Sequence, residues 1–217
     1  MLSFSEENYI KTIYHIEQFQ SDGVSTNAIA KKIQTRASSV TDMLKKLAVK
    51  QLIIYEKYQG AQLTKKGKEI ALKVVRRHRL WEYFLVKKLN YRWDEVHEIA
   101  EQLEHIKSDT LIDNLEEFLR FPKFDPHGDP IPDKNGKMIL TKTVNLSDLK
   151  VGQKGVLDSL KDSSDAFLKY LNKKNLALRD IIKVIDIEPY DNSVHIETKT
   201  HRLLISKKVA QNLNIKI

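Results

Sequence analysis

Residues 25 to 64 read STNAIAKKIQTRASSVTDMLKKLAVKQLIIYEKYQGAQLT, and this segment combines two helix signals with a hairpin signal. Ser25 or Thr26 can cap a short helix that we expect over residues 27–33. A longer helix is predicted over residues 37–50, because its apolar positions recur at helical spacing. The short break between the two predicted helices is typical of a helix-turn-helix.

Both neighbours of this helix pair extend the same pattern. Two short β-like runs flank Gln59 and Gly60, which predicts a hairpin. Upstream, apolar residues with a 3.6-residue period predict a helix over residues 6–20. Three helices followed by a hairpin is the order of a winged helix-turn-helix, whose third helix fits a major groove.

The helical spacing continues past residue 64 and later changes. Helices are predicted over residues 65–89, 94–106 and 108–120, with Thr64, Asp94 and Ser108 as the expected capping residues. Residues 122–136 hold four of the five prolines and are predicted to be a loop. Residues 141–157, 181–188 and 193–206 alternate or are β-branched, and one helix is expected between them at 163–172. We expect a mainly α chain with a β part, divided into a DNA-binding domain (1–66), a helical domain (67–140) and a small β domain (141–217).

Composition narrows the possible functions. The 217 residues are 41% apolar and 30% charged, which is sufficient for a buried core. There is no cysteine, so thiolate nucleophiles, disulfides, zinc fingers and iron–sulfur clusters are excluded. We see no run of 18 apolar residues and no signal-peptide pattern, so we expect a cytoplasmic protein without a membrane partner. The net charge of +8 suits a polyanion, although it could equally serve solubility.

The outer face of the predicted third helix carries short polar and basic residues. Short side chains can approach base edges, and lysines neutralise phosphates. A three-helix bundle whose charged face is only solvated is the alternative, and the adjacent hairpin favours DNA binding. The candidate DNA-binding residues are Arg36, Ser38, Ser39, Thr41, Asp42, Lys45, Lys46 and Lys57.

Histidine and glutamate recur at helical spacing in the predicted helical domain. His97, Glu101, Glu104 and His105 lie on one stripe of the helix predicted over 94–106. His78 and Glu82 fall on the inward stripe of the preceding helix, where an unpaired charge is costly. Nitrogen and carboxylate ligands without sulfur suit Mn, Fe, Zn, Co or Ni. A solvated acidic face with incidental histidines is the alternative.

Several motifs in shared order resemble the diphtheria-toxin-repressor-type metal-dependent transcriptional regulators, in particular their manganese-responsive branch. They are Glu7-Asn8-Tyr9-Ile10-Lys11-Thr12-Ile13-Tyr14, Ser38-Ser39-Val40-Thr41, Leu63-Thr64-x-x-Gly67, Arg77-His78-Arg79-Leu80-x-Glu82, His97 through Glu104-His105, and Pro126-His127-Gly128-x-Pro130-Ile131-Pro132. The resemblance implies a winged helix, a helical dimerisation and metal-binding domain, and a C-terminal SH3-like barrel. It further implies a homodimer that binds palindromic operator DNA when loaded with metal, with no small-molecule substrate.

The resemblance also implies the metal ligands. Glu101, Glu104 and His105 match one centre, to which Asn8 can add an amide oxygen. His78, Glu82 and His97 match a second centre, with Asp125 where some relatives have a cysteine ligand. A ligand from the SH3-like domain is expected at Asp162, with Asp165 as the next choice. Carboxylate at Glu101, where iron-type relatives have cysteine, favours Mn(II), with Fe(II) second and Zn(II), Co(II) or Ni(II) possible in vitro.

Two positions depart from the family pattern. Asn8 stands where relatives have Asp or Met, and Lys11 stands where the dinuclear manganese type has Glu. A charged lysine cannot ligate a metal, so Lys11 argues for two separated sites and leaves open a weakened primary site.

Three functions remain in competition. The leading hypothesis is a metal-activated transcriptional repressor of metal homeostasis genes. A winged-helix regulator without metal sensing is the alternative. A carboxylate-bridged metalloenzyme would need two matched Glu-x-x-His helices, and we find one, so we predict no enzyme activity.

Overall fold

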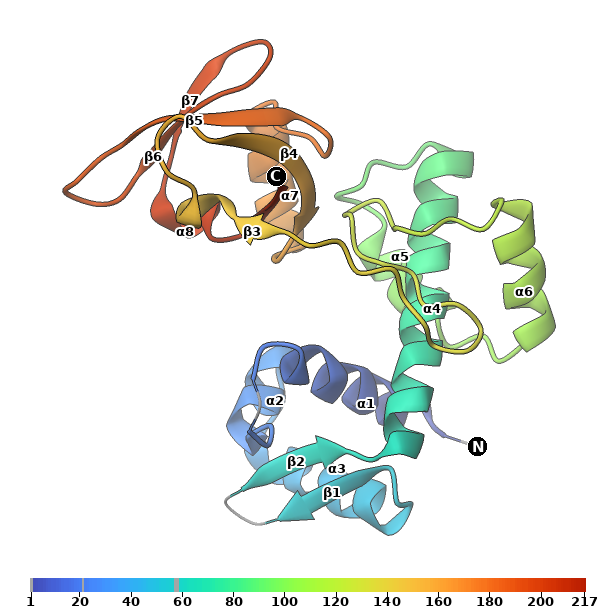
Figure 1. Ribbon diagram of the computed structural model, residues 1–217. Helices are drawn as coiled ribbons and strands as arrows, with labels where there is room; N and C mark the ends of the chain where they lie inside the picture. Colours follow the sequence, from blue (N-terminus) through green and yellow to red (C-terminus); the bar gives the residue numbers. More distant parts are fainter. Residues whose placement is uncertain (1, 21, 57–58) are drawn as a thin grey trace. The chain divides into compact units, whose positions relative to one another are not determined.

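The computed structural model describes residues 2–20, 22–56 and 59–217, and the chain divides into two compact units. The first unit comprises the residues up to His78 together with Glu101–Leu115 and Pro132–Lys137. The second unit comprises Arg79–Ala100, Glu116–Ile131 and Met138–Ile217. Figure 1 gives the labels of the helices and strands in each unit.

Three helices begin the first unit, namely α1 (Phe4–Glu17), α2 (Thr26–Ile33) and α3 (Ala37–Val49). The hydroxyl of Ser3 accepts from the backbone of Glu6, and the Glu6 side chain reaches back to Ser3, so a capping box begins α1. Ser25 caps α2, and a left-handed Gln34 ends it. The apolar faces of the three helices form a common buried core: Ile10, Ile13, Ile29, Val40, Leu44 and Leu47.

The predicted hairpin is present as β1 (Ile53–Glu56) and β2 (Gly60–Leu63), which pair antiparallel. Val24 adds an isolated bridge to Ala61, so the segment before α2 is hydrogen-bonded to the hairpin. Gly60 has a φ of +94°, and a Cβ there would lie 2.6 Å from the Val24 carbonyl oxygen. This close approach requires glycine. The winged helix-turn-helix predicted from the sequence is therefore the fold of this segment.

Three further helices follow, namely α4 (Lys65–Leu89), α5 (His97–Leu103) and α6 (Asp109–Phe118). The predicted bounds of α4 are correct, and this helix contributes residues to both units. The bounds predicted for α5 were wrong at both ends. Asp94 does not begin the helix, because its carboxylate is bound by the Arg92 guanidinium and by the Asn172 amide. The helix ends at Leu103, so Glu104 follows its last turn.

The second unit contains a six-stranded antiparallel sheet with the strand order β3-β8-β4-β5-β6-β7. The strands are β3 (Val144–Asn145), β4 (Lys154–Leu160), β5 (Ile181–Ile187), β6 (Val194–Glu197), β7 (Arg202–Ile205) and β8 (Leu213–Lys216). The helical segments are η1 (Leu146–Asp148), α7 (Asp165–Lys173) and α8 (Lys207–Ala210). Alternating apolar side chains of the sheet pack on α7 around a core that includes Leu157, Leu168, Leu171, Ile182 and Ile196. The β8 strand was not predicted.

Among the described residues, no helix is both long enough and apolar enough to span a bilayer. The apolar residues of the segment 111–119 differ in their exposure. Ile112, Leu115 and Leu119 are buried within the chain, whereas Leu111 and Phe118 are 40% and 59% exposed. Without repacking of the chain, a partner subunit can therefore contact only Leu111 and Phe118 among these five residues.

Candidate metal centres and nucleic-acid interface

A buried cluster of three possible metal ligands lies in the second unit. Glu82 projects from α4, and Asp125 and His127 come from the loop after α6. Each of the three residues offers one ligand atom, and these atoms all lie within 4.8 Å of one another. His127 Nδ1 is 3.5 Å from a carboxylate oxygen of Glu82. Two carboxylates and an imidazole at this spacing suit a divalent transition metal with oxygen and nitrogen preference.

The loop holds these ligands through its own backbone. Asp125 Oδ1 accepts hydrogen bonds from the backbone N–H groups of His127 (2.8 Å) and Asp129 (2.9 Å). Gly128 has a φ of +87°, and a Cβ there would lie 2.2 Å from the Asp158 carbonyl oxygen. The loop can pass this close to β4 only with glycine at this position.

A hydrogen bond sets the orientation of the His127 ring. Its Nε2 lies 2.8 Å from the Trp93 carbonyl oxygen. A carbonyl can only accept, so Nε2 carries the hydrogen and Nδ1 faces Glu82. A backbone carbonyl behind one ring nitrogen is the usual support of a metal-binding histidine. The indole nitrogen of Trp93 in turn donates to Asn172 on α7, which links this support to the sheet domain.

Burial and charge shift the protonation of this cluster. Burial of Asp125, together with the nearby charges of Asp129 and Glu82, raises its pKa to about 7. Burial opposes a charged His127, but its interactions with Glu82 and Asp125 prevail and raise the pKa of the imidazole to about 9. The two carboxylates thus favour positive charge nearby, which the raised pKa of His127 reflects and to which the Arg79 guanidinium, 3.5 Å from Asp125, contributes. A bound cation would serve the same purpose, so these residues fit a divalent metal.

Two further predicted ligands belong to the same unit. His97 on α5 places Nδ1 3.4 Å from the second carboxylate oxygen of Glu82, and 42% of its side chain is exposed. Asp162 is not among the clustered ligand atoms; its Oδ1 accepts from the backbone of Ser164 just before α7. Asp165 is the first residue of α7. A metal-binding role for these residues stays a prediction.

A second charged cluster lies wholly in the first unit and contains the residues predicted as the other centre. Glu104 is fully buried, and Glu101 lies one helical turn before it. The ammonium group of Lys11, from α1, donates to Glu101 Oε1 (2.6 Å) and to both oxygens of Glu104 (2.7 Å each). Lys11 is itself 7% exposed. A lysine therefore already neutralises these carboxylates.

His105 and Asn8 in this cluster have hydrogen-bonding environments that metal ligands also have. His105 Nδ1 lies 2.7 Å from Glu7, while its Nε2 is 3.9 Å from Glu104. The Asn8 amide oxygen is buried and makes no hydrogen bond to any described residue. These features suit a metal, but the Lys11 ammonium does not. An ion that shared the oxygens bound by Lys11 would lie within about 5 Å of a positive charge, since metal–oxygen bonds are about 2 Å long. With Lys11 in this position, the set does not fit a divalent ion.

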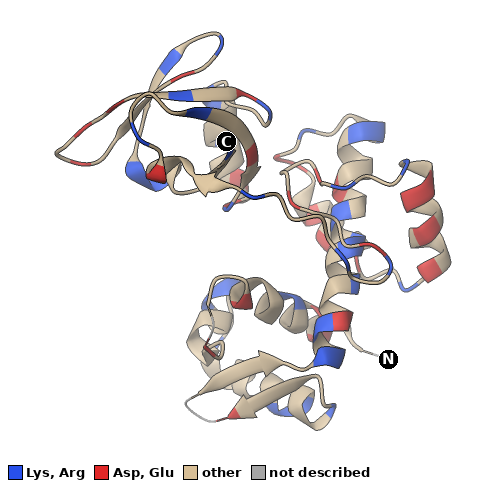
Figure 2. Cartoon of the chain, viewed as in Figure 1, with Lys and Arg blue, Asp and Glu red and all other residues tan. Residues whose placement is uncertain are grey.

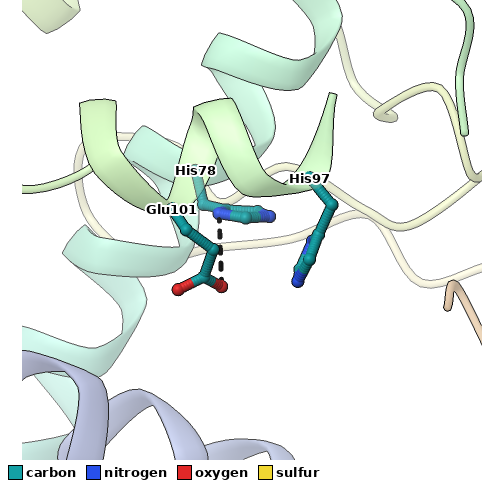
Figure 3. A group of neighbouring side chains, drawn as sticks. All are labelled: His78, His97 and Glu101. Atoms are coloured by element: carbon teal, nitrogen blue, oxygen red, sulfur yellow. Dashed lines mark ion pairs between the residues drawn. The ribbon is translucent and has the colours of Figure 1, made fainter. Parts of the chain in front are cut away.

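The predicted centre of His78, Glu82 and His97 draws on both units. In the first unit, His78 Nδ1 lies 2.6 Å from Glu104 and 3.9 Å from Glu101, and the dashed line in Figure 3 marks the latter contact. His97, also drawn there, belongs to the second unit, as does its partner Glu82. His78 as a ligand of the same ion as Glu82 stays a prediction.

Sequence reasoning did not assign His127 as a ligand, although its Pro-His-Gly motif was recognised. The available signal was the Asp-x-His spacing of Asp125 and His127 in a proline-rich loop. Periodicity cannot reveal such a pair, because it reports only which residues share a face of a helix or strand.

The candidate DNA-binding residues lie on the outer face of α3 and just before it. Thr41 is half-buried, and its hydroxyl donates to the Ala37 carbonyl one turn earlier. Lys57 lies outside the described residues. Figure 2 shows basic residues on α3 and α4 and acidic residues on α6. The exposed candidates are Arg36, Ser38, Ser39, Asp42, Lys45 and Lys46. Their role in DNA binding stays a prediction.

Three family models match successive parts of the chain. Residues 1–61 match the N-terminal DNA-binding domain of iron-dependent repressors, and residues 64–133 match their metal-binding and dimerisation domain. Residues 144–217 match the FeoA domain, which corresponds to the six-stranded sheet. The SH3-like domain predicted from the sequence is thus confirmed. The first two of these families are iron-dependent repressors, which bind DNA and are not enzymes.

The similar curated proteins include a transcriptional regulator and a longer protein that the chain matches over a fifth of its length. Over 122 residues the chain is 37% identical to the HTH-type transcriptional regulator MntR of Oceanobacillus iheyensis, covering 56% of this chain and 81% of that protein. Over 91 residues it is 42% identical to a probable metal transport system membrane protein of Chlamydia trachomatis, covering 42% of this chain but only 20% of that protein.

A solved structure extends the similarity to nearly the whole chain. It is a manganese-dependent transcriptional repressor in complex with manganese, with a TM-score of 0.89 and 32% identity over 97% of this chain and 99% of that one. These relatives support the metal-dependent interpretation over a regulator without metal sensing. The chain therefore belongs to the metal-dependent transcriptional repressors of the diphtheria toxin repressor type, on their manganese-dependent branch.

Proposed function

We propose that this chain represses metal homeostasis genes when a divalent metal binds at Glu82, Asp125 and His127. The buried cluster of these three residues carries the proposal, because its ligand atoms lie within 4.8 Å of one another and its two carboxylates raise the pKa of His127 in spite of burial. Their oxygen and nitrogen donors favour Mn(II) first and Fe(II) second. The solved structure of a similar repressor in complex with manganese supports Mn(II) as the first choice. Zn(II), Co(II) and Ni(II) would bind in vitro.

Each residue of the cluster would have a separate role in binding such an ion. A bound Mn(II) would supply two positive charges to a pair of buried carboxylates. His127 would release its Nδ1 proton to solvent and offer that nitrogen's lone pair to the ion, while the Trp93 carbonyl keeps Nε2 protonated. Asp125 would keep its two backbone hydrogen bonds at Oδ1 and offer Oδ2, which lies 3.5 Å from the Arg79 guanidinium. Glu82 lies on α4, and this helix also contributes residues to the unit with the DNA-binding helices. Metal binding at Glu82 would therefore act on a helix that the two units share.

The DNA partner follows from the winged helix. We propose that α3 enters the major groove with Ser38, Ser39 and Thr41 toward base edges and Lys45 and Lys46 toward phosphates. The family forms dimers through its metal-binding domain. A two-fold symmetric dimer presents two such helices, so we propose a palindromic operator.

The domain boundaries and location of this protein follow from the same proposal. We place the DNA-binding domain at residues 1–66, the dimerisation and metal-binding domain at 67–140 and the SH3-like domain at 141–217. Matches of the three family models to successive segments support these boundaries. Because the proposed partner is operator DNA, we propose a cytoplasmic location.

A DNA-binding titration tests the proposed function. Duplexes would first be selected from random sequence in the presence of Mn(II), and the affinity of the best duplex would then be measured by fluorescence anisotropy with and without Mn(II). We expect Mn(II) to tighten binding about 100-fold, which corresponds to about 2.7 kcal/mol. Glu82→Gln should lose this gain, whereas Glu69→Gln, an exposed carboxylate on the same helix, should keep it. Equal affinities of the wild-type protein with and without Mn(II) would contradict the proposal.

A further inference from the structure

The contacts of Lys11 connect two domains that belong to different family models. Lys11 lies on α1, within the DNA-binding match over residues 1–61. Glu101 and Glu104 lie within the metal-binding match over residues 64–133. The ammonium has three N–H donors, and its three contacts of 2.6–2.7 Å go to three oxygens of these two carboxylates. The lysine therefore uses its whole donor capacity to join the two domains inside the first unit.

The charges of this cluster decide whether a metal can join it. Glu101 and Glu104 carry two negative charges, and Lys11 leaves a net charge of about −1. Without Lys11, the same pair would carry −2 beside His105 and the unpartnered Asn8 amide oxygen, which is a donor set that a divalent ion would neutralise. A positive charge at the centre of the set favours the metal-free form, because like charges repel strongly when they are buried.

We propose that Lys11 is a built-in cation that replaces a regulatory metal between α1 and the end of α5. In this chain the contact between the DNA-binding domain and Glu104 is then independent of metal, and the response to metal rests on the Glu82 centre. This inference extends the proposed function, and it predicts one Mn(II) per chain instead of two. The surrounding residues would be those of a metal site whose metal has been exchanged for an ammonium.

Metal counting tests the proposal directly. The number of Mn(II) ions bound per chain would be measured by electron paramagnetic resonance of free Mn(II), without DNA. We expect one ion in the wild type, one in Lys11→Arg, which keeps the positive charge, and two in Lys11→Met. Glu101→Gln, a change at a partly exposed carboxylate, should leave the wild-type count unchanged. Loss of an ion in Glu101→Gln, or a second ion in the wild type, would overturn the proposal.

Amide hydrogen exchange provides a readout that does not depend on metal binding. In the metal-free protein, the amides of α1 should exchange at least tenfold faster in Lys11→Met than in the wild type, and Mn(II) should restore their protection. Unchanged exchange in Lys11→Met would overturn the proposal. A wild-type protein that bound no Mn(II) would contradict the proposed function, and the exchange of α1 would still decide the role of Lys11.

Discussion

Substitution of Glu82 by Gln should remove most of the stabilisation that Mn(II) gives to this protein. The Glu82 side chain is 3% exposed and lies 3.4 Å from His97 and 3.5 Å from His127. Water cannot readily replace a carboxylate in such a position, and the substitution also removes the charge that attracts the cation. Loss of a residue that hydrogen-bonds to a metal ligand costs about 10- to 100-fold in metal affinity. We therefore expect loss of the ligand Glu82 itself to cost at least about 100-fold.

The change in affinity translates into a measurable thermal shift. At a free Mn(II) concentration of about 100 times the wild-type Kd, binding stabilises the folded protein by about 2.7 kcal/mol. A variant that binds about 100-fold more weakly gains only about 0.4 kcal/mol at the same concentration. For a chain of this length, 1 kcal/mol corresponds to roughly 2–4 °C in Tm. Mn(II) should therefore raise the Tm of the wild type by roughly 5–10 °C and that of Glu82→Gln by about 1 °C.

Differential scanning fluorimetry with and without Mn(II) measures both shifts. The Mn(II)-dependent shift is the relevant quantity, because Glu82→Gln also removes the partner of His127 and should lower the metal-free Tm. Glu69→Gln serves as the matched control, since Glu69 is exposed on the same helix and should leave the shift at its wild-type size. An equal Mn(II) shift in Glu82→Gln and the wild type would refute the assignment of the metal centre.

Four further predictions follow from particular residues. Thr41→Ala should reduce the difference in binding free energy between duplexes by about 1–3 kcal/mol. Lys46→Ala should weaken binding to every duplex and reduce the slope of log affinity against log salt concentration by about 0.9. Anisotropy titrations would measure both effects. Gly128→Ala should destabilise the protein by at least about 1–3 kcal/mol and weaken Mn(II) binding, because a Cβ would meet the Asp158 carbonyl oxygen at a φ of +87°; thermal denaturation and Mn(II) titration would detect this. Phe118→Asp should shift the dimer to monomer in light scattering, since this ring is 59% exposed on α6. Burial opposes ionisation of Glu6, but hydrogen bonds from Lys50 and the Ser3 backbone lower its pKa below 4.5. Glu6→Gln should therefore be less stable than the wild type at neutral pH. This difference in stability, measured by urea denaturation, should vanish as the pH falls through the lowered pKa.

The sequence predicted local structure well wherever a long periodic pattern met a capping residue. Both ends of α4 were correct, because twenty-five residues keep one helical period after Thr64. The start of α5 was wrong, since Asp94 has the residue type of a cap but binds Arg92 and Asn172 instead. A partner 78 positions away cannot be inferred from a local signal. The β8 strand, with four residues, is too short for its alternation to be recognised.

In the candidate sites too, ligands on helices could be predicted from the sequence, whereas contacts between distant residues could not. Stripes of histidine and glutamate on helices were visible in the sequence, and Glu82 was found in this way. His127 lies in a loop, where no periodicity applies, and only the hydrogen bond to Trp93 shows that its ring faces Glu82. The burial of Glu104 was not evident either. It lies after the last turn of α5, yet it shares the Lys11 ammonium with Glu101, as expected for two residues of one stripe.

Position 11 shows why residue types alone could not settle how this cluster is neutralised. From the sequence, Lys11 was recognised as a residue that cannot ligate metal, which excluded a ligand without indicating where the ammonium lies. Its two partners are 90 and 93 residues away along the chain. The buried carboxylate of Glu104 beside that of Glu101 requires positive charge, and either a lysine or a divalent ion satisfies that requirement. The two solutions differ in dependence on solution conditions, because an ammonium is always present whereas an ion is bound only above a certain concentration. One residue on α1 can therefore determine whether the attachment of the DNA-binding domain to Glu104 is permanent or regulated, while the fold and the remaining ligands stay the same.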